Sequence, residues 1–448
     1  MSNFRLVDRD TDFLLPPSVD EWLPQRHLAR FVVEMVEQLD VSNMSRSYRG
    51  SGSAAYHPSM LLGLLIYGYA TGVFSSRKIE RATYDSVAFR FIAANQHPDH
   101  DTLAAFRKRF LPEIEALFVS VLQLAGQMGM LKLGTVALDG TKVAANASRH
   151  SALSWGHANR IEAQLTQEVA ELLALAEQAD AADVPDELSI PEELERRETR
   201  LAAITEAKAQ IQARAAERTA CEQAEYDAKL AARQDKTRRT GKKPGGKPPV
   251  TGARDSDQIN LTDADSRIMK TRKGFDQCYN AQAAVDTQTM LIVGQHLTQA
   301  GNDKQQVKPM LDTLRALPET LGRVETLLAD SGYASQGNVA LTQKADIEPL
   351  IALGRQAHHR PWRERFTEPA PLAPDANAIE TMAHRLKTQE GRALYALRKQ
   401  TVEPVFGIVK SVMGFRQFLL RGKENAGGEW SLVAMSWNIK RMFALQPA

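Results

Sequence analysis

The sequence predicts an α/β protein in which helices flank a mixed sheet, with an all-helical segment before the sheet and a helical hairpin inserted into it. Three observations predict this fold class. Apolar residues recur at helical spacing from about residue 28 to 128. Short apolar runs of strand character then alternate with helical segments between residues 279 and 413. A long, polar, helical stretch at 151–233 separates the first strand from the others.

Composition limits the classes of protein that fit. The length of 448 residues suggests two or three domains. A net charge of +2 makes no overall polycation, so any nucleic-acid surface must come from local basic clusters. Two cysteines support neither a disulfide framework nor a cysteine-based zinc site, which favours a reducing, cytoplasmic location. The polar N-terminus does not fit a signal peptide, and no apolar run reaches the roughly 18–20 residues of a membrane span.

The helical N-terminal segment carries a candidate DNA-binding feature. Between residues 75 and 110 the pattern is helix, turn and helix, and Arg107 and Arg109 lie on the last helix. This order is compatible with a helix-turn-helix DNA reader. A small helical bundle with a solvated basic face fits the same pattern. Arg107 and Arg109 are therefore candidate DNA contacts.

The inserted segment at 151–254 predicts a helical hairpin followed by a basic linker. Apolar stripes occur in both halves, but Lys208 interrupts the heptad series. The hairpin could therefore wind as a loose antiparallel coiled coil or serve as a plain structural arm or dimer contact. Residues 236–247 contain six Lys/Arg and no acid, and their Gly and Pro content predicts flexibility. Phosphate contact and simple solvation both fit this tract, and a second basic patch follows at 358–365.

Three carboxylates stand at special places in the predicted elements. The apolar runs at 136–139 and 327–330 read as strands that end at Asp139 and Asp330. A helix over 390–413 has an apolar face with Glu403 beside it. Carboxylates that converge from such elements can hold two divalent ions, about 4 Å apart, for phosphodiester chemistry. Taken singly, each has an ordinary alternative: a hairpin turn, a helix N-cap and a surface glutamate, respectively.

Other candidate groups have plainer interpretations. Asp263, Asp265 and Asp286 lie in sequences that favour turns or caps. The ten histidines show no metal-ligand spacing. Trp430 and Trp437 could stack on a flipped base, but core packing of a closing helix is the favoured interpretation.

With the insert removed, the order of elements matches an RNase H-like fold, and four segments carry a resemblance to a family. They are 138–148 (LDGTKVAANAS), 274–286 (GFDQCYNAQAAVD), 329–333 (ADSGY) and 402–410 (VEPVFGIVK). On these segments, and on the N-terminal helices with DTLAAFR at 101–107, the chain resembles DDE-class transposases of bacterial insertion sequences. The resemblance covers nearly the whole chain, with the insert as its least specific part.

The resemblance implies an organisation and a set of ligands. A helical DNA-binding domain would span 1–130, and a catalytic domain 131–150 and 255–448, interrupted by the insert at 151–254. Asp139, Asp330 and Glu403 would be catalytic and would ligate two Mg²⁺ ions, with Mn²⁺ as a substitute. The partners would be double-stranded DNA at the terminal inverted repeats and the target, with a homodimer in the synaptic complex and no membrane.

The family's Tyr-Arg-Glu-Lys signature fits Tyr395, Arg398, Glu403 and Lys410, except that the interval from Arg to Glu is one residue too long. On a straight helix Arg398 and Glu403 are about 140° apart, whereas Lys399 and Glu403 are about 40° apart. Either Lys399 replaces the arginine, or Pro404 bends the helix and Arg398 still reaches. We favour Arg398.

In the family these basic residues grip phosphate near the scissile bond, and Lys142 is a further candidate for this role. The expected function is that of an enzyme, a transposase that hydrolyses phosphodiesters at the element ends and transfers the freed strand into target DNA. Two alternatives remain: a metal-dependent nuclease without strand transfer, and a DNA-binding derivative without catalysis.

Overall fold

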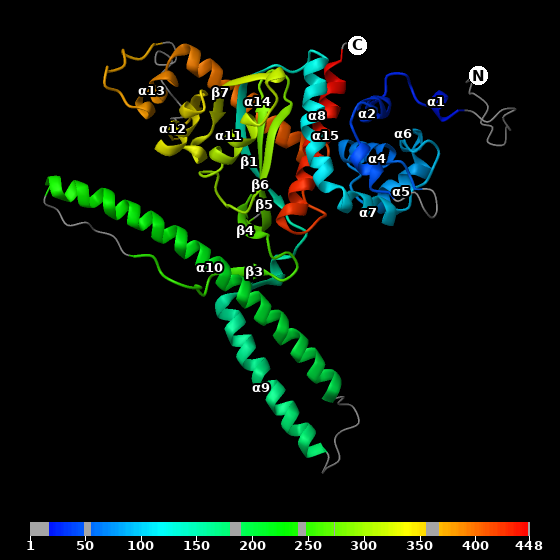
Figure 1. Cartoon of the computed structure of the whole chain (residues 1–448), viewed down its shortest axis with the longest axis vertical. Coiled ribbons are helices and arrows are strands. Elements are labelled where there is room, and N and C mark those ends of the chain that lie inside the picture. Colours follow the sequence, from blue (N-terminus) through cyan, green and yellow to red (C-terminus); the bar gives the residue numbers. More distant parts are fainter. Residues whose placement is uncertain are drawn as a thin grey trace, which may run out of the picture. The chain divides into compact units, whose positions relative to one another are not determined.

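The computed structural model describes most of the chain, namely residues 18–48, 55–179, 190–240, 248–272, 274–354 and 367–446. The basic stretches at 241–247 and 358–365 lie outside the described residues. So do residues 1–17 of the segment 1–20, in which Pro16 and Pro17 predict an irregular N-terminal arm; Val19 and Asp20 already belong to a helix, contrary to that prediction. The chain divides into two compact units: Met1–Ala145 with Cys278–Ala448, and Asn146–Gln277. Figure 1 shows both units.

The predicted N-terminal helices are present. Local sequence explains their ends: Pro58 sits in the first turn of α4, Gly72 closes it in the left-handed conformation, and the Asp99 carboxylate caps α7. α4 is buried along most of its length. The elements are α1 (Val19–Trp22), α2 (Leu28–Glu37), α3 (Ser42–Arg46), α4 (Pro58–Thr71), α5 (Ser76–Asp85), α6 (Val87–Ile92), α7 (His100–Arg109) and α8 (Leu111–Gln127).

These helices share a core with the last helix of the chain, α15 (Lys423–Leu445). α15 packs along α8 and also contacts α4, and Figure 1 shows α8 and α15 side by side. At this junction the Tyr69 hydroxyl donates to Glu429 Oε1 at 2.6 Å. The other oxygen of Glu429 accepts from two backbone N–H groups, those of Leu419 and Leu420. Burial raises the pKa of the Glu429 carboxyl.

Arg107 completes this buried network. Its guanidinium donates to the Tyr69 hydroxyl at 2.9 Å and to the Phe74 carbonyl at 3.2 Å, and the residue is only 6% exposed. A guanidinium enclosed in this way stabilises the core and is not presented to DNA. Arg107 is therefore removed from the candidate DNA contacts; the sequence pattern showed its charge but not its direction.

The mixed sheet confirms the RNase H-like arrangement. Its strand order is β4-β5-β1-β7-β8, and β6 also pairs with β5. β1 runs antiparallel to β5 and parallel to β7, and β7 runs parallel to β8. The strands are β1 (Leu133–Ala144), β4 (Arg267–Thr271), β5 (Gly274–Asp286), β6 (Ile292–Thr298), β7 (Gly322–Ala329) and β8 (Glu348–Ile351).

One strand boundary differs from the prediction. β1 does not end at Asp139 but continues to Ala144, because residues 139–144 keep their pairing with residues 278–283 of β5. On its other side, β1 pairs with β7 only as far as Leu138, which lies opposite Ala329. Asp139 is therefore the first residue of β1 beyond the paired end of β7.

Helices cover both faces of the sheet. They are α11 (Val307–Arg315), α12 (Gln336–Lys344), α13 (Ala378–Arg385), α14 (Gln389–Ser411) and α15. A Cβ at Gly294 of β6 would meet Met310 and Leu314 of α11, whereas the side chain of the next residue, Gln295, donates to Ser431 of α15. Successive strand residues face opposite sides, so α11 and α15 cover opposite faces. α14 packs on β1 and β7.

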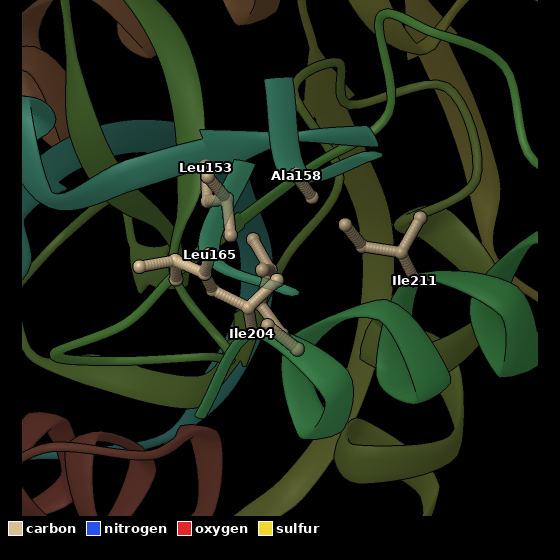
Figure 2. Packing of buried hydrophobic residues seen from close by; sticks show 7 residues of the cluster. Leu153, Ala158, Leu165, Ile204 and Ile211 are labelled. Atoms are coloured by element: carbon tan, nitrogen blue, oxygen red, sulfur yellow. The ribbon is translucent and has the colours of Figure 1, made fainter. Parts of the chain in front are cut away.

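The second unit contains the predicted helical hairpin. α9 (Trp155–Ala179) and α10 (Ile190–Thr240) pack against each other, with β2 (Ala152–Ser154) and β3 (Gln258–Asn260) at one end. Their core, shown in Figure 2, contains Leu153, Ala158, Leu165, Ile204, Ala207, Ile211 and Ile259. α10 is the longer helix and continues to Thr240, so the first part of the basic tract is helical rather than flexible as predicted.

The contacts of Lys208 explain how a charged residue fits into the apolar seam between α9 and α10. Its ammonium is paired with Glu162 of α9 and lies 5.2 Å from the centre of the Trp155 ring. The aliphatic stem can thus stay in the seam while the charged end is compensated.

Among the described residues no single helix is long and apolar enough to cross a membrane, although α4 and α5, bent by 95°, pass together on length and composition.

Candidate active site

Asp139 and Asp330 are brought together by the parallel pairing of β1 and β7. The last paired residues are Leu138 and Ala329, so each acid is the next residue along its chain. Asp330 also accepts from the Gly332 N–H at 2.8 Å and caps the short 3₁₀ turn Ser331–Tyr333. The predicted N-cap role and a role beside Asp139 are therefore compatible, because a carboxylate has several lone pairs.

Glu403 lies on α14, the helix that packs on β1 and β7. Buried valines on the same helix, Val402, Val405 and Val409, anchor it to the fold. The side chain of Glu403 is 50% exposed. Its carboxylate lies 3.1 Å from the Arg398 guanidinium, which also contacts Asp139 Oδ2 at 3.1 Å. A single guanidinium thus joins the first and third predicted acids.

The structure therefore places Arg398, and not Lys399, between these acids. The Arg398 side chain is only 10% exposed, whereas Lys399 is exposed. α14 continues through Pro404, which has no N–H to donate to the carbonyl one turn earlier. The long arginine side chain spans the five-residue interval to Glu403. The angles on an ideal helix alone did not decide between Arg398 and Lys399.

Two further residues of the signature tie α14 to the strands. The Tyr395 hydroxyl donates to the carbonyl of Ala329, the residue before Asp330, at 3.3 Å. The Lys410 ammonium donates to Thr141 Oγ1 at 2.7 Å and to the Lys142 carbonyl at 2.6 Å. Tyr395 and Lys410 therefore lie at the ends of the strands that carry the acids, with their donors satisfied by the protein.

The pKa of Asp139 reflects its burial and the charged groups around it. Burial raises the pKa of the Asp139 carboxyl from 3.8 to about 6; the Gly140 N–H and Arg398 oppose the rise, and the Asp330 and Asp303 carboxylates add to it. Burial lowers the pKa of Arg398, but the surrounding groups, led by Asp139, outweigh burial and raise it above its ordinary value. Arg398 therefore stays charged, and a further cation near Asp139 would favour its ionised form.

This raised pKa gives a pH prediction for protein kept in a metal chelator. The folded state holds the Asp139 proton more tightly than the unfolded chain, so stability falls as pH rises from about 4 to about 6. The loss is about 3 kcal/mol at most, at 1.36 kcal/mol per pH unit. Unfolding by urea at several pH values measures it: the difference in unfolding free energy between the wild type and Asp139→Asn should change with this slope. Identical slopes in both proteins would contradict the prediction.

Sequence reasoning missed Asp303, a fourth carboxylate in this region. It follows β6, and its Oδ1 accepts from Asn280 Nδ2 and Gln282 Nε2, each at 2.7 Å. The predicted phosphate contact Lys142 has its ammonium 4.0 Å from the same oxygen. The only sequence signal was the pair Asn302–Asp303 between a strand and a helix, which a turn explains equally well.

The remaining candidates have separate surroundings. Arg109 is exposed; it donates to the Ser47 carbonyl and lies over the Tyr48 and Phe110 rings. Its contact with DNA stays a prediction. Asp286 accepts from the Gln288 and Thr289 N–H groups, which confirms its interpretation as a turn residue.

The two tryptophans are confirmed as core residues of α15. Trp430 is fully buried and its indole N–H donates to the Gln282 carbonyl. Trp437 is 4% exposed and donates to the Met290 carbonyl. Neither ring is presented to a base.

The donor set fits a hard divalent cation by its chemistry. Carboxylate oxygens are the ligands that Mg²⁺ prefers, and the Asp330 and Asp303 carboxylates are close enough to Asp139 to add to the rise of its pKa that burial causes. Within the described part of the chain, no three His, Cys, Asp or Glu side chains are already arranged around one ion position. Glu403 is half-exposed, so its side chain can rotate away from Arg398.

The sheet order and the two acids at the adjoining ends of β1 and β7 define an RNase H-like protein of the DDE class. Comparison with protein families agrees: residues 237–439 match the transposase DDE domain, and residues 17–109 match a transposase domain (DUF772). The chain therefore belongs to the insertion-sequence transposases of the DDE class, proteins that act on DNA.

The DDE-domain match includes Asp330 and Glu403 but begins after Asp139. The first acid therefore rests on the β1–β7 register and the Arg398 contact. The comparisons found no match to the chain among curated proteins or among solved structures.

The Arg398 contacts predict that Arg398, and not Lys399, is the basic residue of α14 on which DNA cleavage depends. Arg398→Ala should slow DNA cleavage by about 10- to 100-fold, the scale of a lost charged hydrogen bond, and Arg398→Lys should not restore it because an ammonium cannot place two donors as a guanidinium fork does. Lys399→Ala is the matched control and should stay within about twofold. Single-turnover cleavage of end DNA measures all three. A larger effect at Lys399 than at Arg398 would contradict the geometry.

Proposed function

We propose that this transposase hydrolyses a phosphodiester at each end of its own element and joins the freed 3′-hydroxyl to target DNA. Asp139, Asp330 and Glu403 are the proposed catalytic acids. One observation supports the assignment: the β1–β7 register puts Asp139 and Asp330 at adjoining strand ends, and Arg398 contacts both Asp139 and Glu403.

Mg²⁺ is the proposed cofactor, as a pair of ions for which Mn²⁺ can substitute. When bound, such a pair activates water and stabilises the leaving 3′-oxygen. Asp139 and Asp330 would hold it from fixed backbone positions, because both follow directly on a parallel strand pair. Glu403 would complete the set by releasing Arg398.

The cations around the acids would hold the DNA backbone. Arg398, once released from Glu403, has a planar fork that suits a phosphate oxygen pair. Lys142 on β1, and Tyr395 and Lys410 on α14, would position neighbouring phosphates once their present contacts within the protein are released. A helical DNA-binding domain at 1–130 and a homodimeric synapse are part of the same proposal.

A joining assay tests this function. A plasmid that carries both ends of the encoding element is incubated with the protein, Mg²⁺ and a second, unmarked target plasmid. The proposal expects cleavage at the ends and covalently joined product, both lost in chelator. Cleavage without joined product would show a nuclease, and DNA binding without cleavage would show a non-catalytic protein; either result contradicts the proposal.

A further inference from the structure

We propose that Asp303 is a positioning residue for DNA cleavage, and that it acts by seating the ammonium of Lys142 at the catalytic end of β1. This inference rests on the proposed function and adds a residue to it. Asp303 belongs to the loop between β6 and α11.

The strand register puts the partners of Asp303 on one face of the sheet. Gly140 lies opposite Gln282, and Lys142 lies opposite Asn280. Directly opposed residues of an antiparallel pair share a face, so these four residues line one side. Asp139 and Thr141 face the other side, where Lys410 of α14 contacts Thr141. Asp303 therefore supports β1 from the face opposite the Asp139 side chain.

Asp303 is held by two amide donors that cannot turn to water. Asn280 and Gln282 are both fully buried, and their side-chain NH₂ groups point at Asp303 Oδ1. The other end of the Gln282 amide accepts from the Tyr333 hydroxyl at 2.5 Å, which fixes the direction of the amide. This buried chain from Tyr333 through Gln282 to Asp303 fixes the carboxylate beside β1.

The carboxylate and a second acceptor form a seat for an ammonium. Lys142 Nζ lies 4.0 Å from Asp303 Oδ1. Asn280 Oδ1 is buried and has no hydrogen-bond partner among the described residues. Because Lys142 and Asn280 are register partners on the same face, this oxygen is available to an ammonium hydrogen. Burial lowers the pKa of Lys142, and Asp303 is the largest opposing influence.

Gly140 allows Asp303 to approach the strand so closely. A Cβ at this position would lie 2.5 Å from Asp303 Oδ1 and 2.1 Å from Gln282 Nε2. A Cβ at Gly332, two residues after Asp330, would lie 3.7 Å from Asp303 Oδ2. Asp303 thus lies beside the chain segments that follow both strand-end acids. A shift of Lys142 would therefore displace a phosphate bound near those acids.

The test is a double-mutant cycle with Asp303→Asn and Lys142→Met. Asparagine keeps an oxygen for the two amides but loses the charge. We expect each single variant to slow single-turnover cleavage of end DNA by about tenfold, and the double variant to be no slower than Lys142→Met alone. Melting temperatures of all variants should stay close to the wild type, which separates positioning from unfolding.

Three outcomes would overturn the inference. The effects could multiply in the double variant, which would mean that Asp303 does not act through Lys142. Asp303→Asn could leave cleavage unchanged. It could also bind DNA more tightly and cleave no slower, which is the result expected of an acid that merely repels the backbone. Asp139→Asn in the same series tests the proposed function separately, since cleavage by that variant would refute the catalytic acids whatever the cycle shows.

Discussion

Asp139→Asn is expected to abolish DNA cleavage, with a loss of about 10³-fold or more, while DNA binding is retained. The acid is a proposed ligand of the catalytic metal, and metal-ion stabilisation of a phosphoryl transition state is worth several kcal/mol at about 1.36 kcal/mol per decade of rate. Asparagine has nearly the same shape, so the β1–β5 pairing at this position should persist. Single-turnover cleavage and a binding assay in chelator measure the two effects.

The stability of Asp139→Asn provides a second test of the proposed role of Asp139 as a metal ligand. Burial opposes the charged form of Asp139, so its neutral replacement should melt no lower than the wild type in chelator. Mg²⁺ should raise the melting temperature of the wild type but not of Asp139→Asn, because a ligand stabilises only the state that binds it. Asp312→Asn, an exposed acid on α11 paired with Lys308, is the matched control. Full activity in Asp139→Asn would contradict the catalytic role.

Gly140→Ala is expected to cause the second-largest effect, although it adds a single methyl group. The new Cβ would lie 2.1 Å from Gln282 Nε2, 2.5 Å from Asp303 Oδ1 and 2.9 Å from Asn280 Oδ1. Those side chains are fixed by one another, so β1 must shift, at a cost of about 1–3 kcal/mol in stability. The shift occurs one residue from Asp139, and we expect cleavage to fall by about 10²-fold, the scale of a misplacement of about 1 Å.

Gly134 in the same strand provides the control for this prediction. A Cβ there would meet no atom within 4 Å. Gly134→Ala should therefore leave cleavage and the urea midpoint nearly unchanged. Equal losses in both variants would mean that β1 is sensitive to any added side chain, which would contradict a specific clash at Gly140.

Much of the fold could be predicted because local patterns and tertiary structure agree. The order of strands and helices after residue 279 follows from changes of hydrophobic period, and the sheet realises that order. The boundary of β1 could not be predicted in this way. Whether a strand ends at Asp139 or at Ala144 depends on the partner strand β5, which is far away in sequence.

The candidate site, too, could be predicted from the sequence only in part. Asp139, Asp330 and Glu403 could be selected from element ends and family segments. The choice between Arg398 and Lys399 depended on the side-chain reach around Pro404, which an ideal helical wheel does not contain. Arg107 and Asp303 were misjudged or missed for a common reason: charge is visible in a sequence, but the direction in which a charged side chain points is set by distant partners such as Tyr69 and Gln282.

Anomalous scattering from Mn²⁺ in crystals of the protein can show whether the three proposed acids share one divalent-metal site. We expect manganese peaks about 2.2 Å from carboxylate oxygens of both Asp139 and Asp330, with Glu403 turned from Arg398 toward the metal. Manganese bound elsewhere, or bound without contact to Asp139 and Asp330, would contradict the assignment of this site.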